Sequence, residues 1–234
     1  MIRLDKYLSD MGIGTRSELK KSIRGGKVYV DNVCIKRPEE KIDPDAQSVV
    51  FDGKKINYQK MEYYMLHKPS GVVSATKDTK EKTVIDLIKG VKRKDLFPVG
   101  RLDKDTEGLL LITNDGALAH RLLSPGKHVD KVYFARIEGK VTQEDVTRFR
   151  EGLDIGDEEN TMPATLEILV SDTISEIKVT IQEGRYHQVK RMFEAVDKKV
   201  IYLKRLSMGN LILDEKLALG DYRPLTEKEL QSIC

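Results

Sequence analysis

Cysteine is scarce in this sequence, and long uninterrupted apolar runs are missing. The chain has 234 residues and only two cysteines, Cys34 and Cys234, whose separation excludes a disulfide framework or a CxxC zinc site. No uncharged run approaches the roughly 20 residues that a membrane-spanning helix needs. The first ten residues, MIRLDKYLSD, carry charges and lack the apolar core of a signal peptide. We therefore expect a cytoplasmic protein with no membrane partner.

Familiar catalytic signatures are absent as well. There is no GxSxG, no Walker lysine loop, no GxGxxG after a strand and no HExxH. The spacing of the histidines is not typical of metal ligands, so each is expected to be a hydrogen-bonding residue: His67, His120, His128 and His187. The sequence therefore predicts neither a metal site nor a cofactor.

Charge is distributed unevenly along the chain. Overall, the sequence has 41 basic and 38 acidic residues. This net charge of +3 is compatible with a solvated surface as well as with an RNA partner. Residues 1–27 hold seven basic and three acidic residues, and residues 185–205 hold seven and two. Residues 151–160 hold five acidic residues and no basic ones. We interpret the second basic region as suited to phosphates, and the acidic stretch as a solvated loop away from RNA.

The amino-terminal region predicts two helices followed by a hairpin. Helical spacing of apolar residues over 4–11 predicts the first helix, which ends at Gly12 to Gly14. Thr15 and Glu18 form a capping box for the second, which ends at Gly25-Gly26. Residues 28–35, VYVDNVCI, read as two short strands around a tight turn.

The order of these elements carries a first resemblance. RLDKYL followed by TRSELKKSIRGGKVYVDN resembles the S4 RNA-binding domain, which has an αL-like fold. Charge pattern alone favours an ordinary solvated helix face. The resemblance instead implies that the basic side chains of this region contact folded RNA: Arg3, Arg16, Lys20, Lys21, Arg24 and Lys27.

A short polar join over residues 57–62 precedes a larger α+β region. Strands are expected at 109–113, 131–138, 164–170 and 177–181, in a mixed and mostly antiparallel sheet flanked by helices. The spacing of Val189, Met192, Phe193 and Val196 predicts a helix, and TEKEL from Thr226 offers a capping box for a final one.

One polar loop runs directly into a buried strand, PVGRLDKDTEGLLLITNDG from Pro98 to Gly116. Such a junction suits catalysis, because a rigid strand fixes the loop while its polar groups stay accessible. From chemistry alone, a structural turn capped by Asp103 and Asp105 is the favoured interpretation.

The motifs around this loop favour a catalytic role over a structural turn. GRLDKDTEGLLLIT resembles the central motif of pseudouridine synthases of the ribosomal small-subunit type, and YMLHKPSGVV, KVYFARIEG and EGRYHQVKRMF match in order. With the S4 resemblance, the similarity covers essentially the whole chain. It implies an S4 domain over residues 1–57, a linker over 58–62 and a catalytic domain over 63–234.

The resemblance also implies roles for individual residues. Asp103 would be the catalytic carboxylate, Tyr133 would stack on the base and Lys190 would pair with Asp103. An adjacent ammonium keeps a carboxylate ionised. The remaining residues expected to bind substrate are Arg101, Leu206, Gln188 and Arg191. Without the resemblance, a core tyrosine and a solvent-facing lysine would be preferred for Tyr133 and Lys190.

The resemblance therefore implies isomerisation of one uridine, uridine 516 of 16S ribosomal RNA, to pseudouridine, with no cofactor and no metal. Sequence leaves open whether Asp103 attacks the sugar or abstracts a proton. The expected partner is 16S ribosomal RNA or its early assembly particle, bound by a monomer. Two alternatives stay open: a synthase acting on 23S RNA, and a non-catalytic RNA-binding assembly factor. GRYHQVKRM and YRPLT favour 16S, since large-subunit relatives resemble GRNR at the first motif.

Overall fold

The computed structural model describes residues 1–58, 61–91 and 93–233. The chain divides into two compact units. The first comprises Met1–Glu62 with Lys89–Leu96, and the second comprises Tyr63–Ile88 with Phe97–Cys234. The join expected over residues 58–62 includes residues 59 and 60, which lie outside the described residues. Tyr58 packs within the first unit, with its ring centroid 4.8 Å from that of Tyr7.

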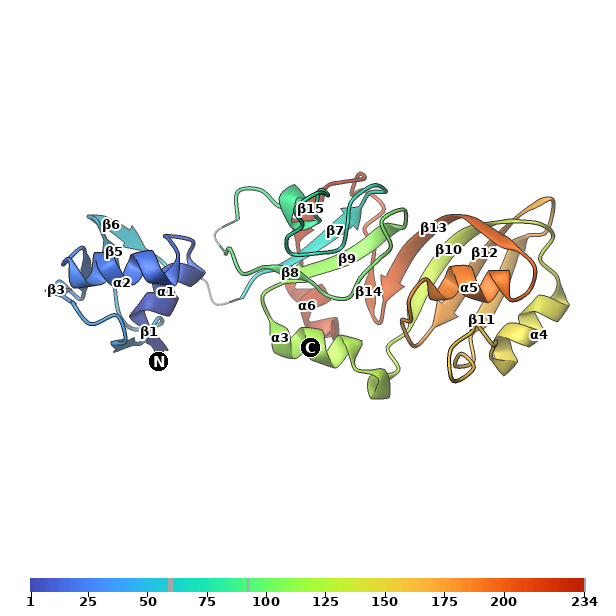
Figure 1. Ribbon diagram of the computed structural model, residues 1–234, viewed down its shortest axis with the longest axis horizontal. Coiled ribbons are helices and arrows are strands. Elements are labelled where there is room, and N and C mark those ends of the chain that lie inside the picture. The colour runs from blue at the N-terminus through green and yellow to red at the C-terminus, as the bar shows by residue number, and fades with distance from the viewer. Residues whose placement is uncertain (59–60, 92, 234) are drawn as a thin grey trace. The chain divides into compact units, whose positions relative to one another are not determined.

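The first unit contains the predicted helices and hairpin (Figure 1). Its helices are α1 (Leu4–Asp10) and α2 (Arg16–Arg24), and the Thr15–Glu18 capping box is confirmed. Asp31 and Asn32 adopt left-handed backbone angles in the turn between β2 and β3, as a tight hairpin requires. A four-stranded antiparallel sheet has the order β3 (Val33–Cys34), β2 (Val28–Val30), β5 (Val49–Phe51), β6 (Lys54–Ile56). The short strands β1 (Ile2–Arg3) and β4 (Lys41–Ile42) pair separately.

The second unit is built on a mixed sheet, as predicted. Its main path runs β11 (Thr165–Val170), β12 (Ile174–Ile181), β10 (Lys131–Glu138), β13 (Lys199–Met208), β9 (Glu107–Thr113), β7 (Tyr63–Lys68), β15 (Tyr222–Pro224). Two short strands pair beside it, β8 (Phe97–Pro98) on β9 and β14 (Leu211–Ile212) on β13. The β13–β9 pair is parallel, and the other described pairs of this sheet are antiparallel.

Helices cover the two halves of this sheet (Figure 1). Two of them, α4 (Gln143–Glu151) and α5 (Gln188–Glu194), contribute Phe149 and Phe193 to a core with β10, β11 and β12. The other two, α3 (Gly116–Leu123) and α6 (Glu227–Ile233), pack with β7, β9 and β14. Short 3-10 turns lie at η1 (Ile85–Leu87) and η2 (Pro125–Lys127).

The parallel β9–β13 contact joins the two halves and depends on a glycine. Gly108 has a φ of +108°, and a Cβ atom there would lie 2.2 Å from the backbone oxygen of Arg205. That distance is far inside van der Waals contact, so any side chain at Gly108 would force the strands apart. The polar loop that precedes β9 is therefore anchored at a close backbone contact.

Two helices of the second unit were not predicted. Asp115, which follows the strand expected at 109–113, caps α3 by accepting a hydrogen bond from the Leu118 amide at 3.0 Å. Thr142 and Asp145 form a capping box for α4. The Thr-x-x-Asp signal was present in the sequence and could have revealed α4.

The capping box predicted for the last helix is confirmed, and it carries a prediction about stability. The Glu229 carboxylate accepts hydrogen bonds from the Thr226 amide at 2.8 Å and from Arg223 Nη2 at 2.7 Å. The Arg223 hydrogen bond is the largest cause that lowers the pKa of Glu229 to about 2. Glu229→Gln should therefore lower the free energy of unfolding by about 1 kcal/mol at neutral pH.

Because the pKa is lowered by folding, this contribution is present above the usual glutamate pKa and is lost as pH falls toward 2. Denaturant unfolding at several pH values should show the two proteins converging in acid. Glu227→Gln is the matched control, since Glu227 is exposed in the same turn. A difference that persists at the lowest pH would contradict the assignment.

Candidate active site

The loop between β8 and β9 carries Asp103, and a buried lysine holds this loop in place. Lys68, at the end of β7, has no exposed surface. Its Nζ donates to the backbone oxygens of Thr106 at 2.8 Å, Asp103 at 3.0 Å, Pro69 at 3.1 Å and Lys104 at 3.2 Å. Sequence reasoning quoted the HKPSG motif but assigned no role to Lys68. The structure identifies it as the group that fixes the loop backbone.

Lys68 is charged at neutral pH despite its burial. Burial lowers its pKa to about 8, against the raising effect of the carboxylates of Asp105, Asp103 and Glu107. We expect Lys68→Met to leave the buried Thr106 carbonyl without its lysine donor, which costs about 1–3 kcal/mol, and to remove further bonds to the Pro69, Asp103 and Lys104 carbonyls. Activity should fall with stability, because Asp103 would lose its fixed position.

The measurement is thermal unfolding together with single-turnover activity at a temperature where the variant remains folded. Lys104→Met is the control, because Lys104 is exposed and bonds only Glu81 among the described side chains. A Lys68→Met protein with ordinary stability and turnover would show that the loop does not need this clamp.

Lys190 and Asp103 lie together, on elements far apart in sequence. Lys190, in the first turn of α5, places its Nζ 3.2 Å from Asp103 Oδ2 and 2.7 Å from Asp105 Oδ1. The expected Lys190–Asp103 pair is therefore present, but Asp105 is a second and closer partner that the sequence analysis did not assign. Asp103 is partly accessible, with 24% of its side chain exposed, so a substrate can reach it.

The electrostatics of this cluster keep its charges in place. Partial burial is the largest single influence on the pKa of Asp105 and raises it, but the hydrogen bond and charge of Lys190, with smaller contributions from a backbone hydrogen bond and His187, together lower the pKa. Burial alone would lower the pKa of Lys190, yet its bonds to Asp105 and Asp103 raise it. An ionised carboxylate beside a protonated amine can act as a nucleophile or a base.

His187, expected only as a hydrogen-bonding residue within the basic region over residues 185–205, is a further neighbour of Asp103. Its Nε2 lies 3.7 Å from Asp103 Oδ1. The residue has a left-handed φ of +48° just before α5, and its ring stacks on Tyr186 at 3.9 Å. Tyr186 is 69% exposed, so the stacked pair presents an aromatic face to solvent beside the carboxylate.

A small cavity of about 60 Å³ opens beside Asp103. Its wall includes Arg101, Tyr133 and Gln188, so the structure brings these expected residues together. Leu206 is not among the described residues that line it; Leu203 is. The physical reason is a β-bulge in β13. Ser207 pairs with Val132 and Arg205 pairs with Tyr133, so Leu206 between them is an additional residue without a partner on β10. Leu206 therefore remains a predicted substrate-binding residue that does not line this cavity.

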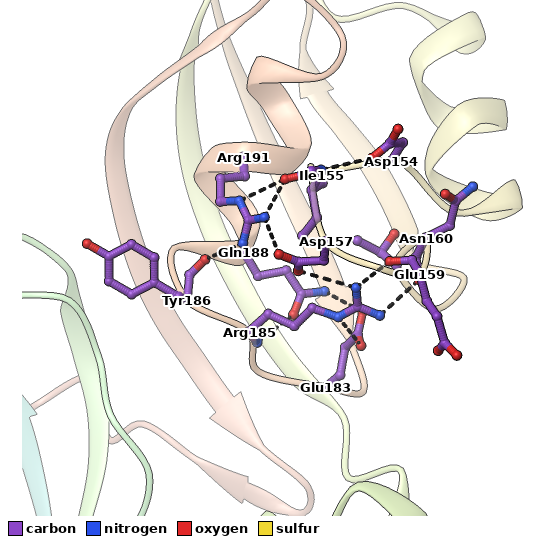
Figure 2. A network of polar contacts seen from close by, with 12 residues as sticks. Asp154, Ile155, Asp157, Glu159, Asn160, Glu183, Arg185, Tyr186, Gln188 and Arg191 are labelled. Carbon is purple, nitrogen blue, oxygen red and sulfur yellow. Dashed lines mark hydrogen bonds and ion pairs between the residues drawn. The ribbon is translucent and has the colours of Figure 1, made fainter.

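The acidic stretch, expected to be a solvated loop away from RNA, forms ion pairs with the second basic region. Arg185 binds Glu183 at 2.9 Å and Asp157 at 3.4 Å, and Arg191 binds Asp157 and the backbone oxygen of Ile155 (Figure 2). Neither arginine is thus free for phosphate in this structure. Opposite charges separated in sequence attract, and a charge count along the chain cannot detect such pairing.

The Gln188 side chain, expected to bind substrate, forms hydrogen bonds with the loop before α5. It is 4% exposed, accepts from the Arg185 amide at 2.9 Å and donates to Glu183 Oε1 at 2.8 Å (Figure 2). These bonds fix the segment that carries His187 and Lys190. Gln188 therefore positions the site, although it also lines the cavity.

In the first unit, the expected RNA-binding side chains differ in availability. Arg3 and Arg16 each bind the buried Asp5 at 3.0 Å, and Lys27 lies 3.9 Å from Asp52. The exposed Lys20, Lys21 and Arg24 of α2 make no ion pair with any described residue. These three are the cations most available to a phosphate backbone.

Within the described ranges, no group of three or more His, Cys, Asp or Glu side chains is arranged to hold a metal ion. No helix in the same part of the chain is long and apolar enough to cross a membrane.

Comparisons with known proteins span both units. The family described as RNA pseudouridylate synthase matches residues 62–195, and the S4 domain family matches residues 2–48. The uncharacterized RNA pseudouridine synthase YtzG of Bacillus subtilis is 48% identical over 98% of this chain and 97% of its own. Ribosomal small subunit pseudouridine synthase A of Escherichia coli is 39% identical over 99% and 100%. A crystal structure of a pseudouridylate synthase has a TM-score of 0.71 at 36% identity and covers 100% of both chains.

Proposed function

Because the chain belongs to the RNA pseudouridylate synthase family, we propose that it converts one uridine of 16S ribosomal RNA to pseudouridine, with Asp103 as the catalytic carboxylate. The observation that carries this proposal is the accessible Asp103 carboxylate paired with Lys190 beside a cavity that Tyr133 lines. The substrate part rests on relatives named ribosomal small subunit pseudouridine synthase A, which are 39–42% identical over nearly the full length. Uridine 516 is the proposed target.

The chemistry needs few groups. The bond from N1 to C1′ breaks, the uracil turns, and C5 joins C1′; C5 loses a proton and N1 gains one, so composition and redox state do not change. Asp103 supplies the negative charge that reacts with the nucleoside, and the Lys190 ammonium lies 3.2 Å from that carboxylate. A base in folded RNA must leave its stack to reach the cavity, which costs a few kcal/mol, and stacking on Tyr133 offsets part of that cost.

We assign the two domains different tasks. An S4 domain over residues 1–57 would bind RNA through Lys20, Lys21 and Arg24, while the domain over residues 63–234 performs the reaction. Separate RNA binding explains why the catalytic cavity can be small.

The direct test uses the purified protein with unmodified 16S RNA, its early assembly particle and 23S RNA in parallel. Carbodiimide-stop primer extension then maps the pseudouridines. One new stop in 16S RNA at position 516 is the expected result. A stop only in 23S RNA would overturn the substrate assignment, and no stop on any RNA that the protein binds would favour a non-catalytic assembly factor.

A further inference from the structure

A second and larger cavity of about 360 Å³ adjoins the same carboxylate. Asp103 and Tyr133 line it as well, so it borders the place where the reaction would occur. Its volume lies in the range of ligand sites in proteins. Several cations share its wall, and two of them, Lys131 and Arg205, have no part in the chemistry described above.

Arg205 is a buried cation with unused donors. It is 2% exposed, and its Nε donates to the backbone oxygen of Leu109 at 2.8 Å. Its Nη2 is buried and has no hydrogen-bond partner among the residues that the structure describes. Arg205 is paired with Tyr133 across β13 and β10, so both side chains face the same side of the sheet. A buried guanidinium nitrogen without a hydrogen-bond partner is costly unless a ligand supplies one.

Lys131 lies on the same face of the sheet, two residues before Tyr133 on β10. It is 8% exposed, and its Nζ donates to the backbone oxygen of Val129 at 3.0 Å. Burial lowers the pKa of Lys131, and the neighbouring charge of Arg205 lowers it further. Two like charges thus lie close together out of water.

The carboxylates around these cations are already occupied. Glu183 pairs with Arg185 at 2.9 Å, and Asp103 pairs with Lys190 at 3.2 Å. Asp130 accepts a hydrogen bond from Gln182 at 2.9 Å. Within the described part of the chain, no carboxylate lies within 4.0 Å of the Lys131 or Arg205 nitrogens. Asp130 and Glu183 raise the pKa of Lys131 through their charges, but neither forms an ion pair with Lys131 or Arg205 among the described residues, so both cations can still take a direct anionic partner.

We propose that Lys131 and Arg205 bind a phosphate group of the RNA substrate, next to the nucleotide that reacts at Asp103. This inference rests on the proposed function and deepens it. The smaller cavity suits the uracil ring, because Ile181, Val189 and Leu203 line it beside Tyr133. Uracil is neutral, whereas each phosphodiester carries a full negative charge, so the phosphate is the ligand that two buried cations favour.

The test compares uridine 5′-monophosphate with uridine, by calorimetric titration into the full-length protein. The monophosphate should bind roughly tenfold to hundredfold more tightly, as expected for charge-assisted hydrogen bonds. Inorganic phosphate should raise the unfolding temperature. Equal binding of the nucleotide and the nucleoside would overturn the inference, since it would mean that the cations contact the base or nothing.

Substitutions test whether Lys131 and Arg205 cause the preference for the monophosphate. Lys131→Gln and Arg205→Gln should each remove most of the preference for the monophosphate, and Lys204→Gln should retain it. Lys204 is the matched control because it precedes Arg205 on β13 and its side chain faces the opposite side of the sheet. If Arg205→Gln does not fold, Lys131→Gln decides alone. A preference that survives in Lys131→Gln would contradict the assignment.

Measuring pseudouridine formation and phosphate preference on the same proteins distinguishes failure of this inference from failure of the proposed function. Pseudouridine formation by the wild type without any phosphate preference would remove the phosphate site and leave the activity standing. A phosphate preference with no pseudouridine in any RNA would do the reverse.

Discussion

Asp103→Asn should abolish pseudouridine formation while folding and RNA binding remain. Asparagine has nearly the same shape but cannot carry the negative charge that reacts with the nucleoside. We expect turnover to fall by roughly 10⁴-fold or more, as for loss of an essential reacting group. Stability should change little, because 24% of the side chain is exposed and the surrounding loop is held through its backbone by Lys68.

Asp105→Asn is the matched control for this variant. Asp105 bonds the same lysine at 2.7 Å, yet its side chain is 68% exposed. Its loss should leave activity within about tenfold of the wild type, since Lys190 keeps Asp103 as a partner. Equal losses in the two variants would mean that the cluster as a whole, rather than Asp103, carries the reaction.

Lys190→Gln should produce the second largest loss, by about 10²- to 10³-fold in turnover. The change removes the ammonium that faces both carboxylates of the loop, at 3.2 Å and 2.7 Å. The neutral amide can donate a hydrogen bond but cannot keep a carboxylate ionised. Arg191→Gln is the comparison on the same helix, because Arg191 binds Asp157 and not the loop of Asp103.

The pH dependence of Lys190→Gln follows from the pairing. The pKa of Asp105 is lowered, so its contribution to stability is present above the usual aspartate value and is lost as pH falls through the folded value. The pKa of Lys190 is raised, so its contribution is present below the usual lysine value and is lost as pH rises through the folded value. Wild-type stability from this pair should be flat around neutrality. The stability difference between the wild type and Lys190→Gln should therefore be constant around neutrality and shrink in acid, and a difference that persists in strong acid would contradict the pairing.

Local patterns predicted most of the fold. The S4 domain and the synthase domain, recognised from RLDKYL and GRLDKDTEG, are both confirmed. Capping boxes at Thr15 and Thr226 and the alternation over residues 131–138 also appear where they were expected. These signals are short in range, so the sequence displays them directly.

The features that sequence reasoning missed depend on contacts between distant segments. Lys68 reaches the loop of Asp103 across 35 residues, and Arg185 reaches Asp157 across 28. The Leu206 bulge depends on register with β10. Pairing, burial and register arise only when strands assemble, so composition and periodicity carry little information about them. The Asp103–Lys190 contact was expected only because family motifs stood at both positions.

The central claim is that Asp103, held beside Lys190, isomerises uridine in RNA. The most direct measurement incubates wild-type protein, Asp103→Asn and Asp105→Asn with the same unmodified 16S RNA particle and maps pseudouridine by carbodiimide-stop primer extension, with RNA binding measured in parallel. We predict one new stop with the wild type and with Asp105→Asn, and none with Asp103→Asn at unchanged RNA affinity. A stop of wild-type intensity with Asp103→Asn would contradict the account.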